Sequence, residues 1–440
     1  MSSTRSRGVL WRNPDFLKFW AGETLSLYGT QVTTLALPLT AMLVFDAGPE
    51  QVGFLRFMQL APYPAFALLF GVWVDRVRRR PLMLGANSVR AVLIGLVPVL
   101  AGMDRLTQPV LLALAFGIGV ASVLFDVSWM SYLPGLLRDK KYLVEANSKL
   151  SITASSADAA GPGLAGVLIS ALTAPVAMVV DAASYLVSVV LLAAIPTREP
   201  APSSAAVRRH LLAELADGLR WVFGNSYLRS IAFVGAFCNF FTMATSTMFI
   251  VYAVRDGGLS PAQLGVVFSL GAVGGLLGSL VSGRLLAHYT PGRVYFWSLA
   301  ATFIGPVLIP LAAGPHWLVF GLFVASFLIA YGGLAVSNVL IVSLRQTVTP
   351  PHLMGRMNAA IRTLLFGGGA LGGPVSGLLA GAVGLRPALW TIGAAAVLML
   401  LPVLLSPVSR LAAMPETRSK APLNPIDPIP SVRGSNTENG

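Results

Sequence analysis

The stretch that decides the fold is Gly71–Pro81, which reads GVWVDRVRRRP. It lies between two apolar segments, residues 52–74 and 82–102, and each is long enough to cross a membrane as a helix. One aspartate and four arginines are crowded into the link between them. Short loops rich in Lys and Arg stay in the cytoplasm, so this turn is predicted to be cytoplasmic. Asp75, at the end of the first segment, can pair with these arginines or cap a neighbouring helix.

The composition indicates a membrane protein with many spans. Of the 440 residues, 55% are hydrophobic and 11% are charged, whereas soluble domains carry about 25% charged residues. The net charge of +13 would suggest a nucleic-acid partner for a soluble protein. Here the basic residues lie in short loops, where membrane orientation and anionic headgroups account for them. We therefore expect membrane lipids, and no nucleic acid, among the partners.

Apolar segments of membrane-spanning length recur twelve times. A helix needs roughly 20 residues to cross the hydrocarbon core. The candidate spans lie near residues 17–45, 51–74, 82–102, 108–133, 150–172, 175–195, 229–254, 262–286, 294–313, 317–342, 354–383 and 386–408. An even number places both termini on one side. Of the 31 Lys and Arg residues, 26 fall on that side and 3 on the other, which predicts an inner or plasma membrane protein with both termini in the cytoplasm.

The two halves of the chain repeat a set of residues at a spacing of 212 positions. The pairs are Asn13 and Asn225, Pro49 and Pro261, Gln51 and Gln263, Gly53 and Gly265, Gly71 and Gly283, and Pro162 and Pro374. This repeat predicts an all-α membrane protein of two pseudo-symmetric six-helix bundles, residues 1–195 and 229–408. The transport pathway is then expected at the seam between the bundles.

Two polar segments complete the predicted organisation. Residues 196–228 form a cytoplasmic linker. Within it, apolar residues recur on a helical period beside Asp217 and Arg220, which predicts an amphipathic helix on the inner membrane surface. Residues 409–440 are rich in Pro, Ser and Asn, and we expect a disordered cytoplasmic tail.

The stretch quoted first resembles the signature loop of the major facilitator superfamily. That loop runs Gly, three residues, Asp, Arg, two residues and two basic residues, and Gly71, Asp75, Arg76, Arg79 and Arg80 fit it. The stretch also lies between the second and third spans, where the family places it. Within the superfamily the pattern looks most like the efflux branch that includes macrolide and enterobactin exporters. The resemblance implies a fold of twelve transmembrane helices and a cytoplasmic gate built from these five residues.

A second resemblance lies in the fifth predicted span. Gly161, Pro162 and Gly166 stand in GPGLAG, which resembles the antiporter motif of the same family, although Ala165 replaces one of its glycines. The resemblance implies a kink that takes part in coupling. Because proline removes one backbone hydrogen bond, a bend without a coupling role is the alternative.

Six ionisable residues lie within the predicted spans of the first half: Glu23, Arg56, Arg90, Asp126, Asp158 and Asp181. A charge at mid-bilayer costs about 2.5–3.5 kcal/mol, so these side chains must face protein or water. A carboxylate in a poorly solvated site can titrate near neutral pH. We therefore predict Glu23 and Asp158 as the proton or cation sites, with permanent pairing to Arg56 or Arg90 as the alternative.

The remaining intramembrane charges have other expected roles. Asp126 and Asp181 lie nearer the two membrane surfaces, and we expect them to be structural partners at helix ends or loops. Arg56 and Arg90 could instead bind an anionic substrate, which would favour siderophore-like or acidic products. The spans of the second half contain no acid between Asp256 and Glu416, so a coupling acid is expected in the first half.

The sequence lacks the signals of an enzyme. There is no GxxxxGK[ST] phosphate loop, and the four histidines lie at loops or span ends without metal-ligand spacing. We expect no metal, no cofactor and no catalytic residue.

These observations predict a monomeric secondary transporter that exports an amphipathic small molecule, such as a drug, a macrolide or a natural product. Proton antiport and alternating access are the expected mechanism, with multidrug resistance as the expected phenotype. The alternatives are a siderophore exporter, a lysophospholipid flippase and, in another class, a non-transporting membrane sensor.

Overall fold

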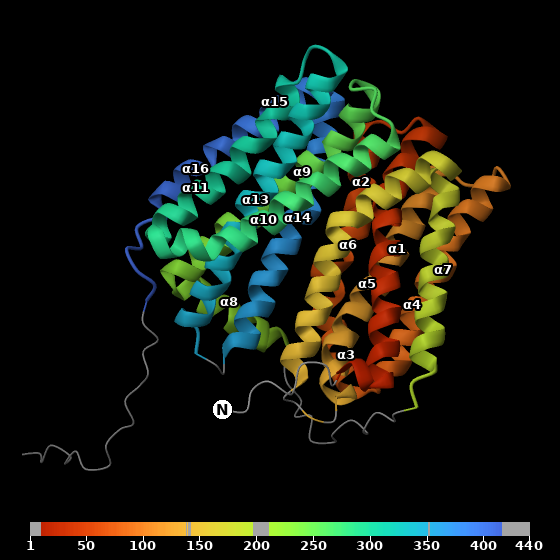
Figure 1. Ribbon diagram of the computed structural model, residues 1–440, viewed down its shortest axis with the longest axis horizontal. Helices are drawn as coiled ribbons and strands as arrows, with labels where there is room; N and C mark the ends of the chain where they lie inside the picture. The colour runs from red at the N-terminus through yellow and green to blue at the C-terminus, as the bar shows by residue number, and fades with distance from the viewer. Residues whose placement is uncertain (1–9, 138, 140–141, 197–210, 351–352, 416–440) are drawn as a thin grey trace, which may run out of the picture.

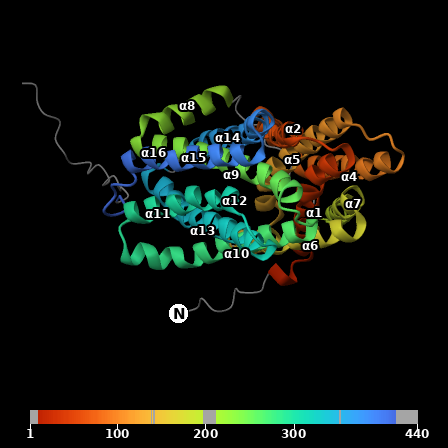
Figure 2. The ribbon, with the colours of Figure 1, turned by 90° about the horizontal axis from the view of Figure 1, so that it is seen from above.

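The computed structural model describes residues 10–137, 139, 142–196, 211–350 and 353–415, with the side chains of 75 and 211–214 left out. Over these residues the chain is helical without strands, and the helices form two bundles side by side (Figures 1 and 2). The predicted tail from residue 416, the linker stretch 197–210 and the side chain of Asp75 lie outside the described part.

The helices of the first bundle follow one another in the chain from residue 10 to residue 193. They are η1 (Leu10–Arg12), α1 (Pro14–Phe45), α2 (Pro49–Leu60), α3 (Pro62–Arg76), α4 (Arg79–Gly102), α5 (Gln108–Leu136), α6 (Leu143–Leu172) and α7 (Ala174–Ala193). Helix α8 (Leu211–Gly224) then leads to the second bundle.

The second bundle contains the helices from residue 226 onwards. They are α9 (Ser226–Arg255), α10 (Pro261–His288), α11 (Pro291–Ile304), η3 (Gly305–Val307), α12 (Leu308–Leu311), α13 (His316–Val348), α14 (Met354–Val383), α15 (Leu385–Leu398) and α16 (Leu400–Leu405).

Several repeated residues form the helix starts. Asn13 and Asn225 are the N-caps of α1 and α9, and each side-chain oxygen accepts two backbone N–H bonds at 3.0–3.1 Å. Gln51 and Gln263 accept a bond from the backbone N–H of the N-cap residues of α2 and α10. Such caps satisfy donors that a helix start leaves unpaired. Part of the repeat at 212 positions therefore reflects equivalent helix starts in the two bundles.

Prolines interrupt three of the predicted spans. The second span is divided into α2 and α3 at Ala61, directly before Pro62. The span from residue 291 is divided by η3, which contains Pro306, and the last span is divided at Met399, three residues before Pro402. Proline cannot donate the backbone hydrogen bond of a continuous helix, which explains these breaks. Helix α6, in contrast, runs through Pro162 without interruption.

Eleven spans in the described part of the chain are long and apolar enough to cross a membrane. Helix α6 is not among them, although it has 30 residues, because polar side chains such as Ser155 and Asp158 lower its hydropathy. The protein is thus an all-α multi-pass membrane protein of two bundles. The expected number of twelve transmembrane helices stays a prediction.

Helix α8 lies elsewhere than the sequence suggests. We expected its apolar face on the membrane surface. Instead Leu215, Leu219 and Val222 pack in one cluster with residues of α9 and α14, including Met357 and Ile361. The described part of this apolar face therefore packs against protein, and α8 contacts the start of α14.

Candidate functional site

A large cavity lies between the two bundles. It has a volume of about 930 Å³ and is lined by α1, α2 and α6 of the first bundle and by α9, α10 and α13 of the second. Drug-sized ligands occupy pockets of about 300–1,000 Å³. The cavity is therefore large enough for an amphipathic small molecule.

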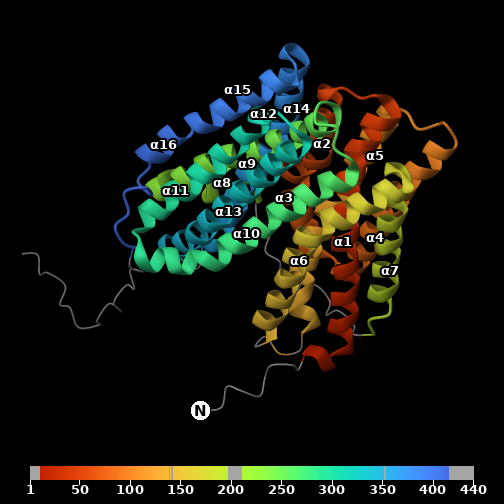
Figure 3. The same ribbon diagram turned by 45° about the horizontal axis from the view of Figure 1, so that its top comes forward.

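One end of this cavity is closed by two pairs of helices that meet almost backbone to backbone. Helix α2 meets α14, and α6 meets α10 (Figure 3). At these contacts Gly53 faces Gly373, and Gly265 faces the carbonyl group of Pro162. A methyl group at Gly53 would lie 3.2 Å from the Cα atom of Gly377, and one at Gly265 would lie 3.1 Å from that of Gly166. Only glycine permits these approaches, which small residues favour in membranes.

The two contacts are related by the sequence repeat. Gly53 and Gly265 are equivalent, and Pro374 of α14 is equivalent to Pro162 of α6. Each bundle thus contributes one glycine near the start of its second span and one proline-containing helix to the closed end. The bundles diverge toward the end where α3 ends and α6 begins (Figure 1).

An ion pair and hydrogen bonds also join the two bundles at the closed end. Nη2 of Arg255 lies 2.7 Å from Oδ1 of Asp46 and also donates to the carbonyl groups of Asp46 and Ala47 at 3.1 Å. The backbone N–H of Ala262 donates to Oγ of Ser170 at 3.1 Å. Both contacts join the first bundle to the second.

Arg56 lies on α2 one turn beyond Gly53 and lines the cavity. Its Nη1 atom donates to Oε1 of Gln59 at 3.2 Å, and its Nε atom is buried without a partner. Arg56 also interacts electrostatically with Tyr331 of α13. Among the described side chains, no carboxylate lies within 4.0 Å of this guanidinium.

Asp158 lies on α6 one turn before Pro162 and is exposed to the same cavity. Its Oδ1 atom accepts a bond from Nε2 of Gln31 at 2.8 Å. Two of the six predicted intramembrane charges, Asp158 and Arg56, therefore share the cavity, and each lies one turn from a closing contact.

Arg90 lies inside the first bundle and is buried. Its Nε atom donates to Ser122 Oγ at 3.0 Å, its Nη1 atom donates to Asn87 Oδ1 at 3.3 Å, and its guanidinium lies 5.0 Å from the ring centroids of Phe125 and Tyr185. Arg90 does not line the central cavity. Its contacts are with hydroxyl, amide and aromatic groups of its own bundle.

The remaining three acids also lie within the first bundle. Glu23 interacts electrostatically with Arg90 and Asp126, and its Oε2 atom is buried without a hydrogen-bond partner. Asp126 accepts a bond from Tyr63 Oη at 2.7 Å, and Asp181 accepts bonds from Thr33 and Ser184.

The expected location of Asp126 and Asp181 at helix ends is wrong. Asp126 lies ten residues before the end of α5, and Asp181 lies seven residues after the start of α7, where it is fully buried. Hydroxyl donors on α3, α1 and α7 provide their hydrogen bonds. The alternative of a permanent pair between an acid and Arg56 or Arg90 is not formed in the described part, where no carboxylate lies within 4.0 Å of either guanidinium.

The gate and kink residues have distinct surroundings. Arg80 donates to the carbonyl groups of Leu192 and Ala193 at 3.1 and 2.6 Å, so it binds the end of α7. Arg76 is exposed at the end of α3, Arg79 begins α4, and Gly71 has open space around it. In the kink motif, Gly161 adjoins Gln31 of α1, while Pro162 and Gly166 adjoin α10.

Two tyrosines at the bundle interface were not predicted. Tyr63 bonds to Asp126 while its ring stacks on Phe366 of α14, with centroids 4.6 Å apart and planes 5° apart. Tyr331 lines the central cavity from α13. Most aromatic residues in apolar spans face lipid or the core. No local signal in the sequence therefore distinguishes Tyr63 and Tyr331 from them.

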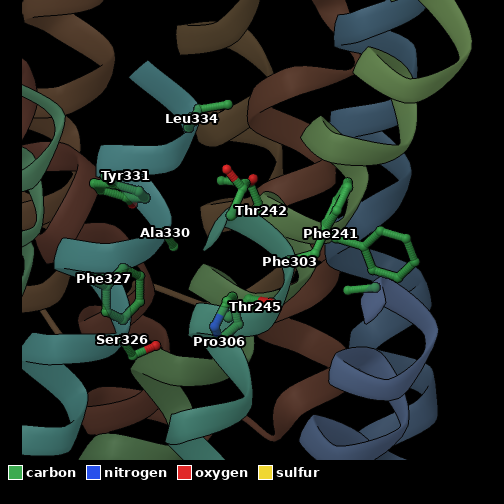
Figure 4. A pocket seen from close by; sticks show the side chains of 12 residues that line it. Phe241, Thr242, Thr245, Phe303, Pro306, Ser326, Phe327, Ala330, Tyr331 and Leu334 are labelled. Atoms are coloured by element: carbon green, nitrogen blue, oxygen red, sulfur yellow. The ribbon is translucent and has the colours of Figure 1, made fainter. Parts of the chain in front are cut away.

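A second cavity lies inside the second bundle, between α9, α11 and α13 (Figure 4). Its volume of about 20 Å³ is enough for about one water molecule. Tyr331 lines both cavities. The smaller one cannot hold a transported molecule, and no group of three metal-ligating residues occurs in the part of the chain that the structure describes.

Comparisons with known proteins agree with this architecture. The sequence profile of the Major Facilitator Superfamily matches residues 19–372 and 232–436. The multidrug efflux pump Tap of Mycolicibacterium fortuitum is 26% identical over 385 residues, which cover 85% of this chain and 91% of Tap. The enterobactin exporter EntS of Escherichia coli O1:K1 is 26% identical over 393 residues, covering 86% and 90%. The resemblance predicted from the Gly71–Pro81 stretch is therefore confirmed.

Solved structures show the same fold. A bacterial homologue of the iron transporter ferroportin, in an inward-facing state, matches with a TM-score of 0.73 and 18% identity over 91% of this chain and 99% of that chain. The nucleoside transporter NupG matches with a TM-score of 0.69 and 14% identity, over 89% of this chain and 98% of NupG.

Proposed function

Because the chain belongs to the Major Facilitator Superfamily, we propose that it is a secondary active transporter that exports an amphipathic small molecule by proton antiport and alternating access. One observation carries this proposal. A cavity of about 930 Å³ lies between the two bundles and is closed at one end by glycine contacts. The name of the multidrug efflux pump Tap favours a drug as the exported molecule, and the name of the enterobactin exporter EntS favours a natural product. A macrolide is added by the resemblance of the Gly71–Pro81 stretch to the efflux branch.

Alternating access requires the bundles to separate where they now meet. We propose that residues 1–195 and 229–408 rock as units, so that the contacts at Gly53 and Gly265 open while the other end closes. The latch proposed for the opposite end is the loop with Asp75 and Arg79, which follows from the family resemblance. Close backbone packing stabilises the contacts at Gly53 and Gly265. The helices can therefore separate there without breaking many hydrogen bonds.

The orientation follows from charge. The protein is a multi-pass inner membrane protein, and the excess of Lys and Arg on the side of the termini favours a cytoplasmic location for both. The cavity would then open toward the cytoplasm in this conformation. A monomer surrounded by lipid is sufficient for this cycle, since both bundles belong to one chain.

Asp158 and Glu23 are the proposed proton sites. Asp158 is exposed to the cavity, where protonation could alternate with substrate binding. The Oε2 atom of Glu23 is buried in the first bundle without a hydrogen-bond partner, so a proton bound there during the cycle would not displace an existing hydrogen bond at this atom. Inward movement of a proton supplies about 2.3 kcal/mol per 100 mV of membrane potential.

Efflux measurements in cells test this proposal. Cells with and without the gene are loaded with a panel of dyes, macrolides and siderophores, with and without a protonophore. Gene-dependent efflux that the protonophore abolishes is expected. Asp158→Asn and Glu23→Gln should reduce proton-coupled efflux, whereas Asp104→Asn, at an exposed loop position, should not. Efflux that is insensitive to the protonophore would contradict proton antiport, and its complete absence would favour a sensor.

Two other substrates remain candidates. A siderophore is favoured by the relative EntS and by the cavity-facing charge of Arg56. A lysophospholipid would place its headgroup in the same cavity. The siderophores in the efflux panel test the first, and transfer of a labelled lysophospholipid between the leaflets of proteoliposomes tests the second.

A further inference from the structure

We propose that Arg56 and Tyr331 form an anion site at the closed end of the central cavity, so that the transported molecule carries one anionic group on an apolar body. Carboxylate, phosphate and catecholate groups share the chemistry that such a site binds. The inference rests on the proposed function, because it names the substrate class of the same cavity.

The guanidinium of Arg56 carries a charge that the described part of the protein does not neutralise. In the described part of the protein its hydrogen-bond partner is the neutral amide of Gln59, and its Nε atom is buried and unpaired. A charge within the membrane is costly unless it faces water or a partner. Arginine also donates two parallel hydrogen bonds to a carboxylate or phosphate, which a ligand in the cavity could accept.

Tyr331 adds a donor from the other bundle. It lies on α13 and lines the same cavity as Arg56. In the described part of the chain, no group is hydrogen-bonded to its hydroxyl. A phenolic hydroxyl can donate to an anion, so an anion between Arg56 and Tyr331 would contact both bundles at once.

The location explains how binding could be coupled to movement. Arg56 lies one turn from Gly53, and a methyl group at Gly373 would lie 3.1 Å from Cβ of Arg56. An anion bound here would therefore sit directly beside the α2–α14 contact. The contact must open for release on the other side, so the bound anion is placed where the two conformations differ.

Asp158 restricts the substrate further. It faces the same cavity from α6 and is bonded to Gln31. When ionised, it repels a second negative charge on the ligand. The site therefore favours a molecule with one anionic group directed at Arg56 and a neutral or hydrogen-donating part toward Asp158. Leu276, Val339 and Val342 provide the apolar wall for the rest of the molecule.

Binding of a matched pair of probes to the purified full-length protein in detergent tests the anion site. Dansylaminoundecanoic acid and its methyl ester share one apolar body and differ in the carboxylate. We expect the wild-type protein to bind the acid more tightly than the ester. Arg56→Gln should weaken binding of the acid at least about tenfold, as expected for the loss of charge-assisted hydrogen bonds, and leave the ester within about twofold.

Three further variants keep the test decisive. Tyr331→Phe should weaken binding of the acid by about threefold to tenfold and leave binding of the ester unchanged. Arg56→Lys should retain a preference for the acid, and it covers the case in which Arg56→Gln does not fold. Arg293→Gln, at an exposed position outside the cavity, is the matched control and should bind both probes as the wild type does. Equal affinity of the wild type for both probes, or equal weakening of both by Arg56→Gln, would overturn the inference.

Competition separates the sources of the anion. Displacement of the acid by lysophosphatidylglycerol alone would assign the site to lipid headgroups, and displacement by dihydroxybenzoate alone would assign it to soluble acids. Displacement by neither would contradict an anion site. These measurements need no gradient. Cells that export nothing, together with a purified protein that prefers the acid, would contradict the proposed function and leave the anion site standing.

Discussion

A methyl group at position 53 should prevent the two bundles from meeting at their closed end. In Gly53→Ala, the new Cβ atom would lie 3.0 Å from the carbonyl carbon of Gly373 and 3.2 Å from Cα of Gly377, and it would overlap the carbonyl oxygen of Gly373. Carbon atoms in contact are normally about 3.5–4.0 Å apart. The helices α2 and α14 must therefore move apart by somewhat less than about 1 Å to accommodate the methyl group.

The size of the effect follows from the cost of overpacking. Inserting a methyl group into a tightly packed contact costs about 1–3 kcal/mol. If the contact exists only in the present conformation, the ratio of this conformation to its alternative should fall by about 5- to 150-fold. Gly85→Ala is the matched control, because its Cβ atom would meet no atom within 4 Å and it brings the same change in helix propensity.

Disulfide formation on the other pair of closing helices measures this shift. The pair Ser170→Cys and Ala262→Cys joins α6 to α10, where the N–H of Ala262 now donates to Ser170 Oγ at 3.1 Å. Both are introduced with Cys238→Ser, which removes the buried native cysteine. Gly53→Ala should slow cross-linking and reduce efflux, while Gly85→Ala should change neither. A folded Gly53→Ala protein that cross-links and exports at the control rate would refute the closing role of the glycine contacts.

Three further substitutions test other parts of the structure. Asn225→Ala removes the N-cap of α9 and should lower the free energy of unfolding by about 1 kcal/mol, as measured by denaturant titration in detergent; an unchanged midpoint would contradict the cap. Gly218→Leu places a side chain against the backbone of Arg356 and should release α8 from α14, so that hydrogen exchange in α8 increases; unchanged protection would contradict the described packing. Thr33→Val leaves a buried oxygen of Asp181 without its donor and should cost about 1–3 kcal/mol of stability; thermal unfolding of Thr33→Ser, which keeps the hydroxyl, is the control, and equal loss in both would show that the hydrogen bond is not responsible.

Local signals in the sequence were sufficient for the membrane class and for the approximate positions of the apolar spans. Hydropathy depends on composition alone, so the apolar spans were recognisable without any knowledge of packing. The repeat that includes Asn13 and Asn225 indicated two related halves, and the structure adds that both residues are N-caps, which act within three residues of the chain. The charges of Arg56 and Asp158 stood out because charged residues are rare within apolar spans.

Tertiary packing alone decided which of these residues meet. The sequence shows four of the intramembrane charges in the same kind of setting, within an apolar span of the first half: Glu23, Arg56, Arg90 and Asp158. In the structure, Arg56 and Asp158 line the central cavity, while Glu23 and Arg90 lie inside the first bundle. Helical periodicity shows that a residue lies on a face, but it does not show which neighbouring helix that face contacts. For the same reason the sequence could not reveal that α8 packs on α14 or that Tyr331 and Arg56 line one cavity, since both depend on the arrangement of segments that are more than 100 residues apart.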